Sequence, residues 1–365
     1  MNIQVYFPEP TPPRSVPQNL FSTLDIEIDS LLDATKARER FSVDGSGLAV
    51  AVLDTGLRVT HKCFRGRVLE PHNFLLDPEG NSDDVEDTNG HGTNVAGIIA
   101  AGTSDERRGI APRANIIPLK VIPAADIEPI FEALRWVYNN TERFNITVVN
   151  FSFGIPSINH IDDHLASRDF PELSRLLDML LEKRVAVVVG AGNDYWQDQK
   201  EGMTIPAIFR QVISVGAVYD TSFGSRSYRD GAIANSTHAD QITPYSQRLS
   251  KYTSPDCYTD VFSAGGQATS AGAGDDDDTS IREGTSQASP TVAGTILLLQ
   301  QYYLRMKGVR PTISLLQDIL RATSKWITDG DDEDDNVIHT NKKYPRINAF
   351  QSLSALHKAI QLGNV

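Results

Sequence analysis

A tight turn that opens directly into a long apolar helix constrains this chain more than any other stretch. Residues 284–290 read Gly-Thr-Ser-Gln-Ala-Ser-Pro, and residues 291–299 are mostly apolar. This pattern predicts a turn that delivers Ser286 to the first turn of a buried helix. Unpaired N–H groups and the positive end of the helix dipole would stabilise an oxyanion formed there. Pro290 is compatible because, early in a helix, its missing N–H removes no intrahelical hydrogen bond. The alternative is an ordinary helix capped by Ser or Thr.

A serine nucleophile needs a base, and the base needs a group that orients it. Residues 89–100 place His91 between two glycines at the entrance of a small-residue helix. Residues 48–56 read as an apolar strand that ends in Asp54 and a glycine turn, where α/β enzymes display functional groups. Taken singly, His91 reads as structural and Asp54 as a turn cap. Their order with Ser286, each in a glycine-flanked turn, favours catalysis.

These residues resemble the subtilisin-like serine proteases, whose catalytic groups follow the order Asp, His, Ser. The resembling segments are 52–56, 91–97, 284–290 and Ala191-Gly192-Asn193, which closes the strand at 185–189. The resemblance implies that Asn193 donates its side-chain amide to the oxyanion. An amide on a rigid strand end suits that task, and losing one such donor costs about 3–4 kcal/mol of barrier. Alone, Asn193 would read as a turn residue.

The resemblance also implies a cleft in which a peptide or protein substrate binds as an extended strand. The residues implied to border this cleft and its S1 pocket are Ser152, Phe153, Gly154, Ala191, Gly192 and Thr285. Ile155 stands where many relatives have a second glycine, so it is expected to crowd a subsite. Asp194 would place a carboxylate at the pocket rim and favour a basic P1 residue, although rim charges are screened.

Two residues near the predicted nucleophile and base depart from the family pattern. Gln287 stands where most relatives carry methionine, and Asn94 where many carry a second histidine. Neither is a triad position, so we expect both to tune packing or hydrogen bonding around the site.

Composition narrows the classes of protein that fit. The chain of 365 residues is 40% hydrophobic and 22% charged, as in ordinary soluble globular proteins. A net charge of −13 argues against nucleic acid and anionic membranes as partners, since both require a basic face. Two cysteines make no disulfide framework, although one bridge stays open. Residues 1–10 lack the basic and apolar regions of a leader, so we expect a cytoplasmic protein.

Strands and helices alternate along the chain, as a parallel sheet requires. Together with the resemblance, this predicts one subtilisin-like α/β domain over residues 46–365, with a doubly wound, mostly parallel sheet and helices on both faces. Residues 1–45 are predicted as an N-terminal extension. Intracellular members of the family resemble it best, because they have a short N-terminal segment across the cleft. We hypothesise that residues 1–20 act as such a plug; the alternative is a loose or surface-docked tail.

Three further segments are ambiguous. Residues 220–243 are rich in Ser, Asp, Arg and Gly and are predicted as an exposed loop. Residues 275–278 and 329–336 are carboxylate clusters of a kind that calcium favours, although solvated charge runs are commoner. The expected reaction needs no cofactor, and structural calcium is an open alternative.

The function expected is that of a serine endopeptidase acting through an acyl-enzyme. One alternative is a transpeptidase or macrocyclase, which resolves the same acyl-enzyme with an amine and needs a lid against water; residues 220–243 are the candidate lid. The other alternative is a catalytically silent peptide-binding scaffold.

Overall fold

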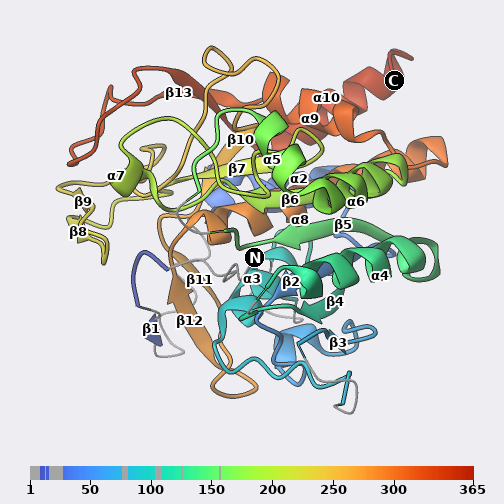
Figure 1. Cartoon of the computed structure of the whole chain (residues 1–365). Helices are drawn as coiled ribbons and strands as arrows, with labels where there is room; N and C mark the ends of the chain where they lie inside the picture. The colour runs from blue at the N-terminus through green and yellow to red at the C-terminus, as the bar shows by residue number, and fades with distance from the viewer. Residues whose placement is uncertain are drawn as a thin grey trace.

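The computed structural model describes residues 9–12, 14–15, 28–75, 81–102, 109–124, 126–155 and 158–365. Its centre is a nine-stranded sheet in the order β13-β14-β10-β7-β6-β5-β2-β4-β3 (Figure 1). All neighbouring strands are parallel except β13 and β14. The strands are β2 (Ala49–Asp54), β3 (His72–Asn73), β4 (Asn115–Lys120), β5 (Ile146–Phe151), β6 (Ala186–Gly190), β7 (Ile213–Val218), β10 (Val261–Ala264), β13 (Lys325–Thr328) and β14 (Lys343–Arg346).

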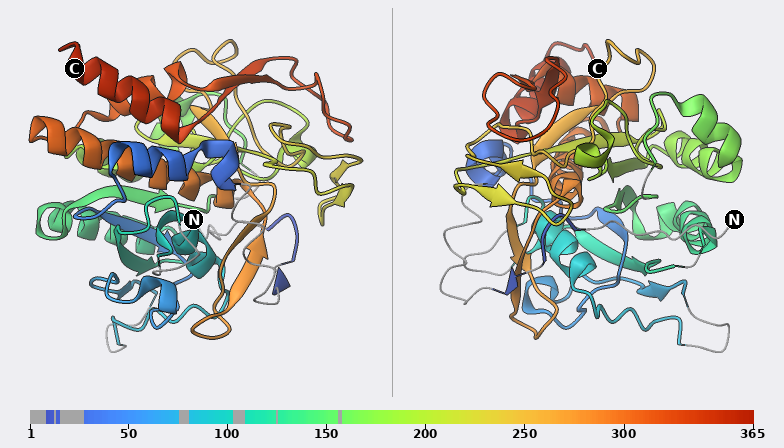
Figure 2. Two further views of the ribbon diagram at one scale, coloured as in Figure 1. Left: turned by 180° about the vertical axis from the view of Figure 1, so that it is seen from behind. Right: turned by 60° about the vertical axis from the view of Figure 1, so that its left-hand side comes forward.

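Helices cover both faces of this sheet, as the right-hand view of Figure 2 shows. On one face lie α4 (Glu128–Phe144), α5 (Asp163–Asp169) and α6 (Pro171–Glu182). On the other lie α2 (Ala34–Phe41), α3 (His91–Ala100), α8 (Thr285–Lys307), α9 (Ile313–Ala322) and α10 (Ala349–Gln361). A 3₁₀ turn covers Lys62–Phe64 and a short α7 covers Tyr195–Asp198. The predicted doubly wound α/β fold is confirmed.

The interior strand β2 shows why the sheet forms. Alternate residues of a strand point to opposite faces, so Val50 and Val52 join the apolar cluster under α3 and α8. Ala49, Ala51 and Leu53 join the cluster under α4 and α6. All six residues of β2 are buried. A parallel strand covered on both faces therefore reads as a continuous apolar run.

A second sheet brings the N-terminus to the segment before Ser286. β1 (Arg14–Ser15) pairs antiparallel with β12 (Thr279–Arg282), which pairs with β11 (Ala268–Ala271). The Glu9 carboxylate forms an ion pair with Arg282. Most of the predicted plug, residues 1–8, 13 and 16–20, lies outside the described residues. Its described part lies along the strand that leads to the nucleophile turn.

Residues 220–243 are exposed at many positions, as their composition predicts, but they also form a hairpin that packs against the rest of the chain. β8 (Arg226–Ser227) pairs antiparallel with β9 (Ile233–Ala234), and Ala232 and Thr237 are buried. The hairpin is bonded to the loop at 329–341, for example from Ile233 N–H to Asn336 Oδ1 at 2.8 Å. The prediction missed this hairpin because the loop that contacts it lies far along the chain.

Both cysteines, Cys63 and Cys257, are buried, and their sulfur atoms are not bonded to each other. They therefore form no disulfide, and the fold is held by packing. Among the residues that the structure describes, every helix is too short or too polar to cross a bilayer.

Candidate active site

The segments singled out in the sequence meet at the carboxyl edge of the main sheet. β2 ends in Asp54, β5 is followed by Ser152, and β6 is followed by the loop that carries Asn193. These three strands are parallel neighbours, so their carboxyl ends share one edge. Helices α3 and α8, which begin at His91 and Thr285, pack against each other there. The fold thus places the elements that carry all four residues predicted to be catalytic at one edge of the sheet.

Asp54 and His91 form a buried pair. His91 Nδ1 lies 2.7 Å from Asp54 Oδ1, and both side chains are buried. Burial lowers the pKa of His91, but attraction to Asp54 and the hydrogen bond to it outweigh burial, so the pKa is raised. Gly92 permits this approach, because a Cβ there would lie 2.2 Å from the carbonyl oxygen of Gly56. Among the described residues, the buried His91 Nε2 has no hydrogen-bond partner.

Asp87, which sequence reasoning missed, organises the loop before α3. Its Oδ1 accepts the Gly90 N–H and its Oδ2 accepts the Thr93 N–H, both at 2.8 Å. Thr55 Oγ1 donates to Asp87 at 2.8 Å and accepts the Gly92 N–H at 2.9 Å. The available signal was an aspartate shortly before a helix start, where caps are common.

Ser286 is the second residue of α8 and follows the turn at Gly284. Its Oγ donates to the carbonyl oxygen of Ser152 at 2.8 Å. In this arrangement the hydroxyl therefore makes no hydrogen bond to His91. The Ser152 hydroxyl donates in return to the Ser286 carbonyl at 2.9 Å.

Pro290 explains the second of these bonds. It is the sixth residue of α8, so its missing N–H leaves the Ser286 carbonyl without its helical donor. The Ser152 hydroxyl supplies that donor instead. The expectation that Pro290 removes no intrahelical bond was wrong, because Pro290 lies beyond the first turn.

Asn193 lies beside the start of α8 with its amide held in one orientation. Its Oδ1 accepts the Thr285 N–H at 2.9 Å and the Thr285 hydroxyl at 3.0 Å. Both partners donate, which assigns the oxygen to this side and the nitrogen to the other. Among the described residues, the buried Asn193 Nδ2 has no partner. An oxyanion would supply the acceptor that this nitrogen lacks.

The two residues that depart from the family pattern contact each other. Gln287 Nε2 donates to Asn94 Oδ1 at 3.4 Å. Asn94 Nδ2 donates to the carbonyl and the hydroxyl of Ser280 on β12, both at 3.0 Å. These two residues therefore link α3, α8 and β12 next to Ser286, so the two departures form one unit.

Thr204 joins the predicted cleft segment 191–193 to Ile155, the residue that follows the predicted segment 152–154. The Thr204 N–H donates to the Ala191 carbonyl at 3.1 Å, and its hydroxyl donates to the Ile155 carbonyl at 2.7 Å. The Ile155 side chain is buried in the apolar cluster under α4 and α6. Hydrogen bonds through Thr204 therefore tie together the two segments that are predicted to border S1.

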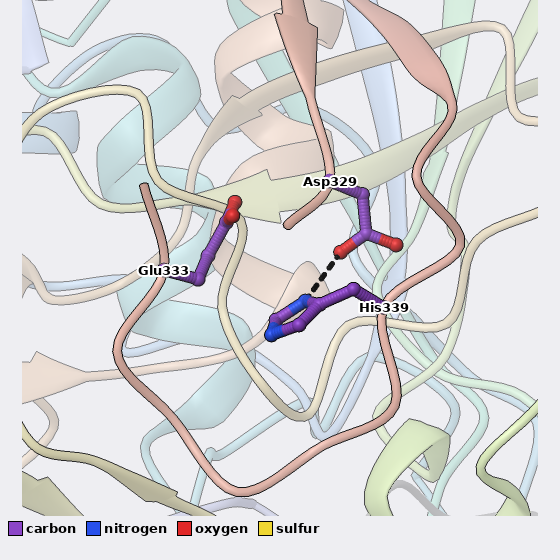
Figure 3. A group of neighbouring side chains, drawn as sticks. All are labelled: Asp329, Glu333 and His339. Atoms are coloured by element: carbon purple, nitrogen blue, oxygen red, sulfur yellow. Dashed lines mark hydrogen bonds and ion pairs between the residues drawn. The ribbon is translucent and has the colours of Figure 1, made fainter. Parts of the chain in front are cut away.

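The aspartates at 329–336 include the best-formed candidate for holding a metal ion. Asp329, Glu333 and His339 offer ligand atoms within 4.8 Å of one another (Figure 3). However, Asp329 Oδ1 already bonds His339 Nδ1 at 3.0 Å, and Oδ2 lies 3.0 Å from Arg248 Nε. A cation placed there would face a buried guanidinium, which disfavours metal binding.

Comparison with known proteins agrees with this geometry. A model of the subtilase family matches residues 45–350. The chain belongs to the subtilase family. Family membership confirms the predicted resemblance and the class of subtilisin-like serine peptidase.

Three relatives illustrate the match. The chain is 32% identical to the major intracellular serine protease of Bacillus subtilis over 53% of this chain and 58% of the relative. It is 30% identical to an intracellular serine protease of Paenibacillus polymyxa over 70% of this chain and 68% of the relative. It is 28% identical to the serine protease AprX of Bacillus subtilis over 86% of this chain and 70% of the relative. The matched part thus spans between 58% and 70% of these relatives.

Proposed function

We propose that this subtilase is a serine endopeptidase that uses Asp54, His91 and Ser286 as a triad and Asn193 as an oxyanion donor. One observation carries the proposal: among the described residues, the buried His91 Nε2 and Asn193 Nδ2 have no hydrogen-bond partner, at the edge where α8 presents Ser286. The reaction needs one nitrogen, in the triad, to take the serine proton and a separate N–H donor to stabilise the oxyanion.

In the proposed reaction the Ser286 hydroxyl leaves the Ser152 carbonyl and gives its proton to His91 Nε2 as Oγ attacks the scissile carbonyl. Asp54 stabilises the resulting imidazolium. The oxyanion accepts hydrogen bonds from Asn193 Nδ2 and the Ser286 N–H, which lies among the unpaired groups of the helix start. His91 then protonates the leaving amine, and water releases the acyl group from Ser286.

The remaining features extend this proposal. Substrate would bind as an extended strand beside residues 152–154 and 191–193, and we propose residues 46–365 as the catalytic unit. The names of two relatives support a cytoplasmic location.

Residues 1–20 would restrict access to the cleft, so deleting them should raise peptidase activity. Unchanged activity after the deletion would discard the plug.

The hydrogen bonds that hold residues 220–243 in place favour hydrolysis over transpeptidation. The hairpin at 220–243 is bonded to the loop at 329–341 through Asn235 and Asn336, so it is already fixed in place. A lid would need to move on substrate binding.

A fluorophosphonate probe and a peptide library test the proposal. The wild type should label at one serine and cleave internal peptide bonds, and Ser286→Ala should do neither. Ser314→Ala, an exposed serine on α9, is the matched control and should behave as the wild type. Asn193→Ala should lower kcat by about 100- to 1,000-fold, the range for one oxyanion donor in a subtilisin. A folded wild type that neither labels nor cleaves would support the silent scaffold instead.

A further inference from the structure

Two buried charged residues precede the nucleophile turn: Arg282, the last residue of β12, and Glu283, which follows it. Arg282 and Glu283 are each 3% exposed, and Gly284, Thr285 and Ser286 follow at once. Charged side chains are rarely buried unless they are paired, because desolvation of an isolated ion is costly. Their partners therefore reveal what holds the turn in place.

The Glu283 carboxylate forms its ion pair with Arg226, which lies on β8 in the 220–243 insertion. The two side chains are only 2% and 13% exposed. Removing one member of such a pair leaves a buried charge without compensation. The insertion is thereby tied to the residue just before the nucleophile turn.

A cluster of buried tyrosines makes a second connection between the insertion and this turn. The hydroxyl groups of Tyr219 and Tyr228 bond each other, and the Tyr228 ring meets Tyr245 edge to face at 5.0 Å. The Tyr245 hydroxyl donates to the Gly265 carbonyl at 2.7 Å. The same carbonyl accepts the Gly284 N–H at 2.9 Å. The insertion therefore reaches both Glu283 and Gly284.

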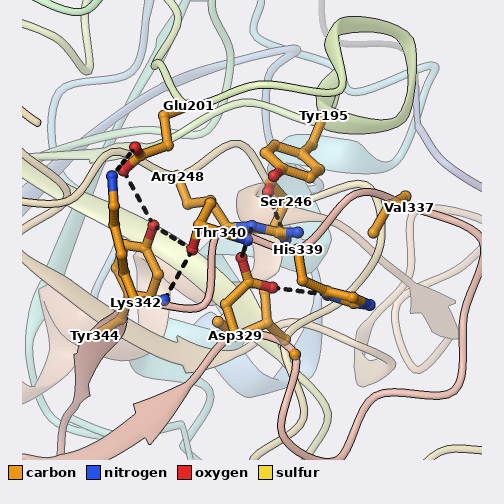
Figure 4. A network of polar contacts seen from close by, with 12 residues as sticks. Tyr195, Glu201, Ser246, Arg248, Asp329, Val337, His339, Thr340, Lys342 and Tyr344 are labelled. Carbon is orange, nitrogen blue, oxygen red and sulfur yellow. Dashed lines mark hydrogen bonds and ion pairs between the residues drawn. The ribbon is translucent and has the colours of Figure 1, made fainter.

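The segment that carries Tyr245 also braces the loop of Asn193. The Tyr245 carbonyl accepts the Tyr195 N–H at 3.1 Å, and the Gln247 N–H donates to the Gly192 carbonyl at 2.8 Å. Figure 4 shows the next residue, Arg248, beside Tyr195 and Asp329, with its guanidinium carbon 3.5 Å from the ring centre of Tyr195. One frame thus supports both the nucleophile turn and the amide beside it.

We propose that Arg226 and Glu283 are positioning residues that hold the nucleophile turn at the correct distance from Asn193; the inference rests on the proposed peptidase function. Gly284 has a φ of +144°, and a Cβ on it would lie 3.2 Å from Asn193 Nδ2. A displacement of Gly284 therefore changes the spacing between the Ser286 N–H and the Asn193 amide. Both groups would act on charge that develops in the transition state, so loss of the ion pair should lower kcat more than it raises KM.

Glu283→Gln tests this inference, because it removes the charge and keeps the shape. The matched control is Asp163→Asn, which breaks the pair between Arg210 and a 5% exposed aspartate on α5. For each variant we would measure active-site concentration by burst titration, kcat per titrated site, KM and Tm. Glu283→Gln should lower kcat per site by about 10- to 100-fold with KM nearly unchanged, the size expected for misplaced catalytic groups. Asp163→Asn should lower Tm and leave kcat per site unchanged.

The same measurements separate positioning from simple stabilisation. If Glu283→Gln lowers Tm or the fraction of titratable sites but leaves kcat per site at the wild-type value, the inference is overturned. Should that variant not fold, Arg226→Lys keeps the charge and loses the paired N–H geometry, and it should retain an intermediate kcat. Wild-type kcat in folded Arg226→Lys would equally overturn the inference. Failure of the proposed function is distinct, since it appears as an inactive wild type or an active Ser286→Ala.

Discussion

The two aspartate-rich segments, 275–278 and 329–336, have similar compositions, but only the second contains a completely buried aspartate. In the first, Asp276 and Asp277 are half exposed and form ion pairs with Arg58 and Lys62, both at 2.9 Å. In the second, Asp329 is completely buried. The contrast shows that the contribution of a carboxylate to stability depends on its burial and its partners. The number of acidic residues nearby in the sequence does not reveal either.

The causes of the pKa shifts of Asp329 and Asp276 differ in the same way. Burial alone would raise the pKa of Asp329, but Arg248, His339 and Thr340 more than offset burial and lower the pKa to about 2. Arg248 is itself 1% exposed, so neither member of the pair is screened by water. Hydrogen bonds from Thr60 and Arg58 also lower the pKa of Asp276, but there solvent screens the interaction.

Asp329→Asn should have the largest effect of the changes that probe this comparison. It leaves the Arg248 guanidinium buried without its counter-charge, which typically costs about 3–5 kcal/mol. Urea unfolding should therefore show a much lower midpoint with an unchanged slope. Asp331→Asn, at an exposed position of the same loop, is the matched control and should unfold like the wild type. Equal losses of stability in the two variants would contradict the conclusion that burial determines how much a carboxylate contributes.

His339→Gln should have a smaller effect on the free energy of unfolding, and this effect should depend on pH in a direction that the pKa of His339 fixes. His339 faces Asp329 at 3.0 Å and Asp335 at 3.3 Å, with Arg248 nearby. The hydrogen bond to Asp329 raises the pKa of His339 above 6.5; burial and Arg248 oppose this shift, and the two carboxylates reinforce it. A raised pKa stabilises the folded state fully below pH 6.5, and this stabilisation is lost as pH rises through the folded-state pKa.

Urea unfolding at pH 5.5 and pH 8.5 would check this sign. The wild type should exceed His339→Gln in free energy of unfolding at the lower pH, and the gap should narrow at the higher pH. At the acid end, the depressed pKa of Asp329 contributes stability that is lost as pH falls from about 4 towards 2. A gap that is independent of pH would show that His339 acts through packing alone.

Local patterns in the sequence sufficed to predict the main strands and to select the residues of the proposed triad. Asp54, His91 and Ser286 each stand near a glycine and an apolar segment in the sequence, and such signals span only a few residues. The same holds for β2, whose continuous apolar run reports burial on both faces.

The remaining features depend on partners distant in sequence. Arg248 gives no local sign that it will be buried against Asp329, and Glu283 gives none that its partner is Arg226. Asp87 has only the weak local signal of an aspartate shortly before a helix, although its oxygens organise the start of α3. Polar networks are built from pairings that only the fold creates, which is why the apolar framework was easier to predict than its buried charges.

The smallest effect is expected at the exposed aspartates, and it bears on calcium. The carboxylates of Asp276 and Asp277 are already paired with cationic side chains, so Asp276→Asn should leave Tm within about 1–2 °C of the wild type. For the same reason, millimolar calcium should not move the Tm of the wild type, since a ligand raises Tm only when it binds the folded state. A rise in Tm with calcium that Asp276→Asn abolishes would instead assign a structural calcium site to residues 275–278. The two segments would then no longer differ in this respect, because residues 275–278 would hold a bound cation just as Asp329 holds the buried Arg248.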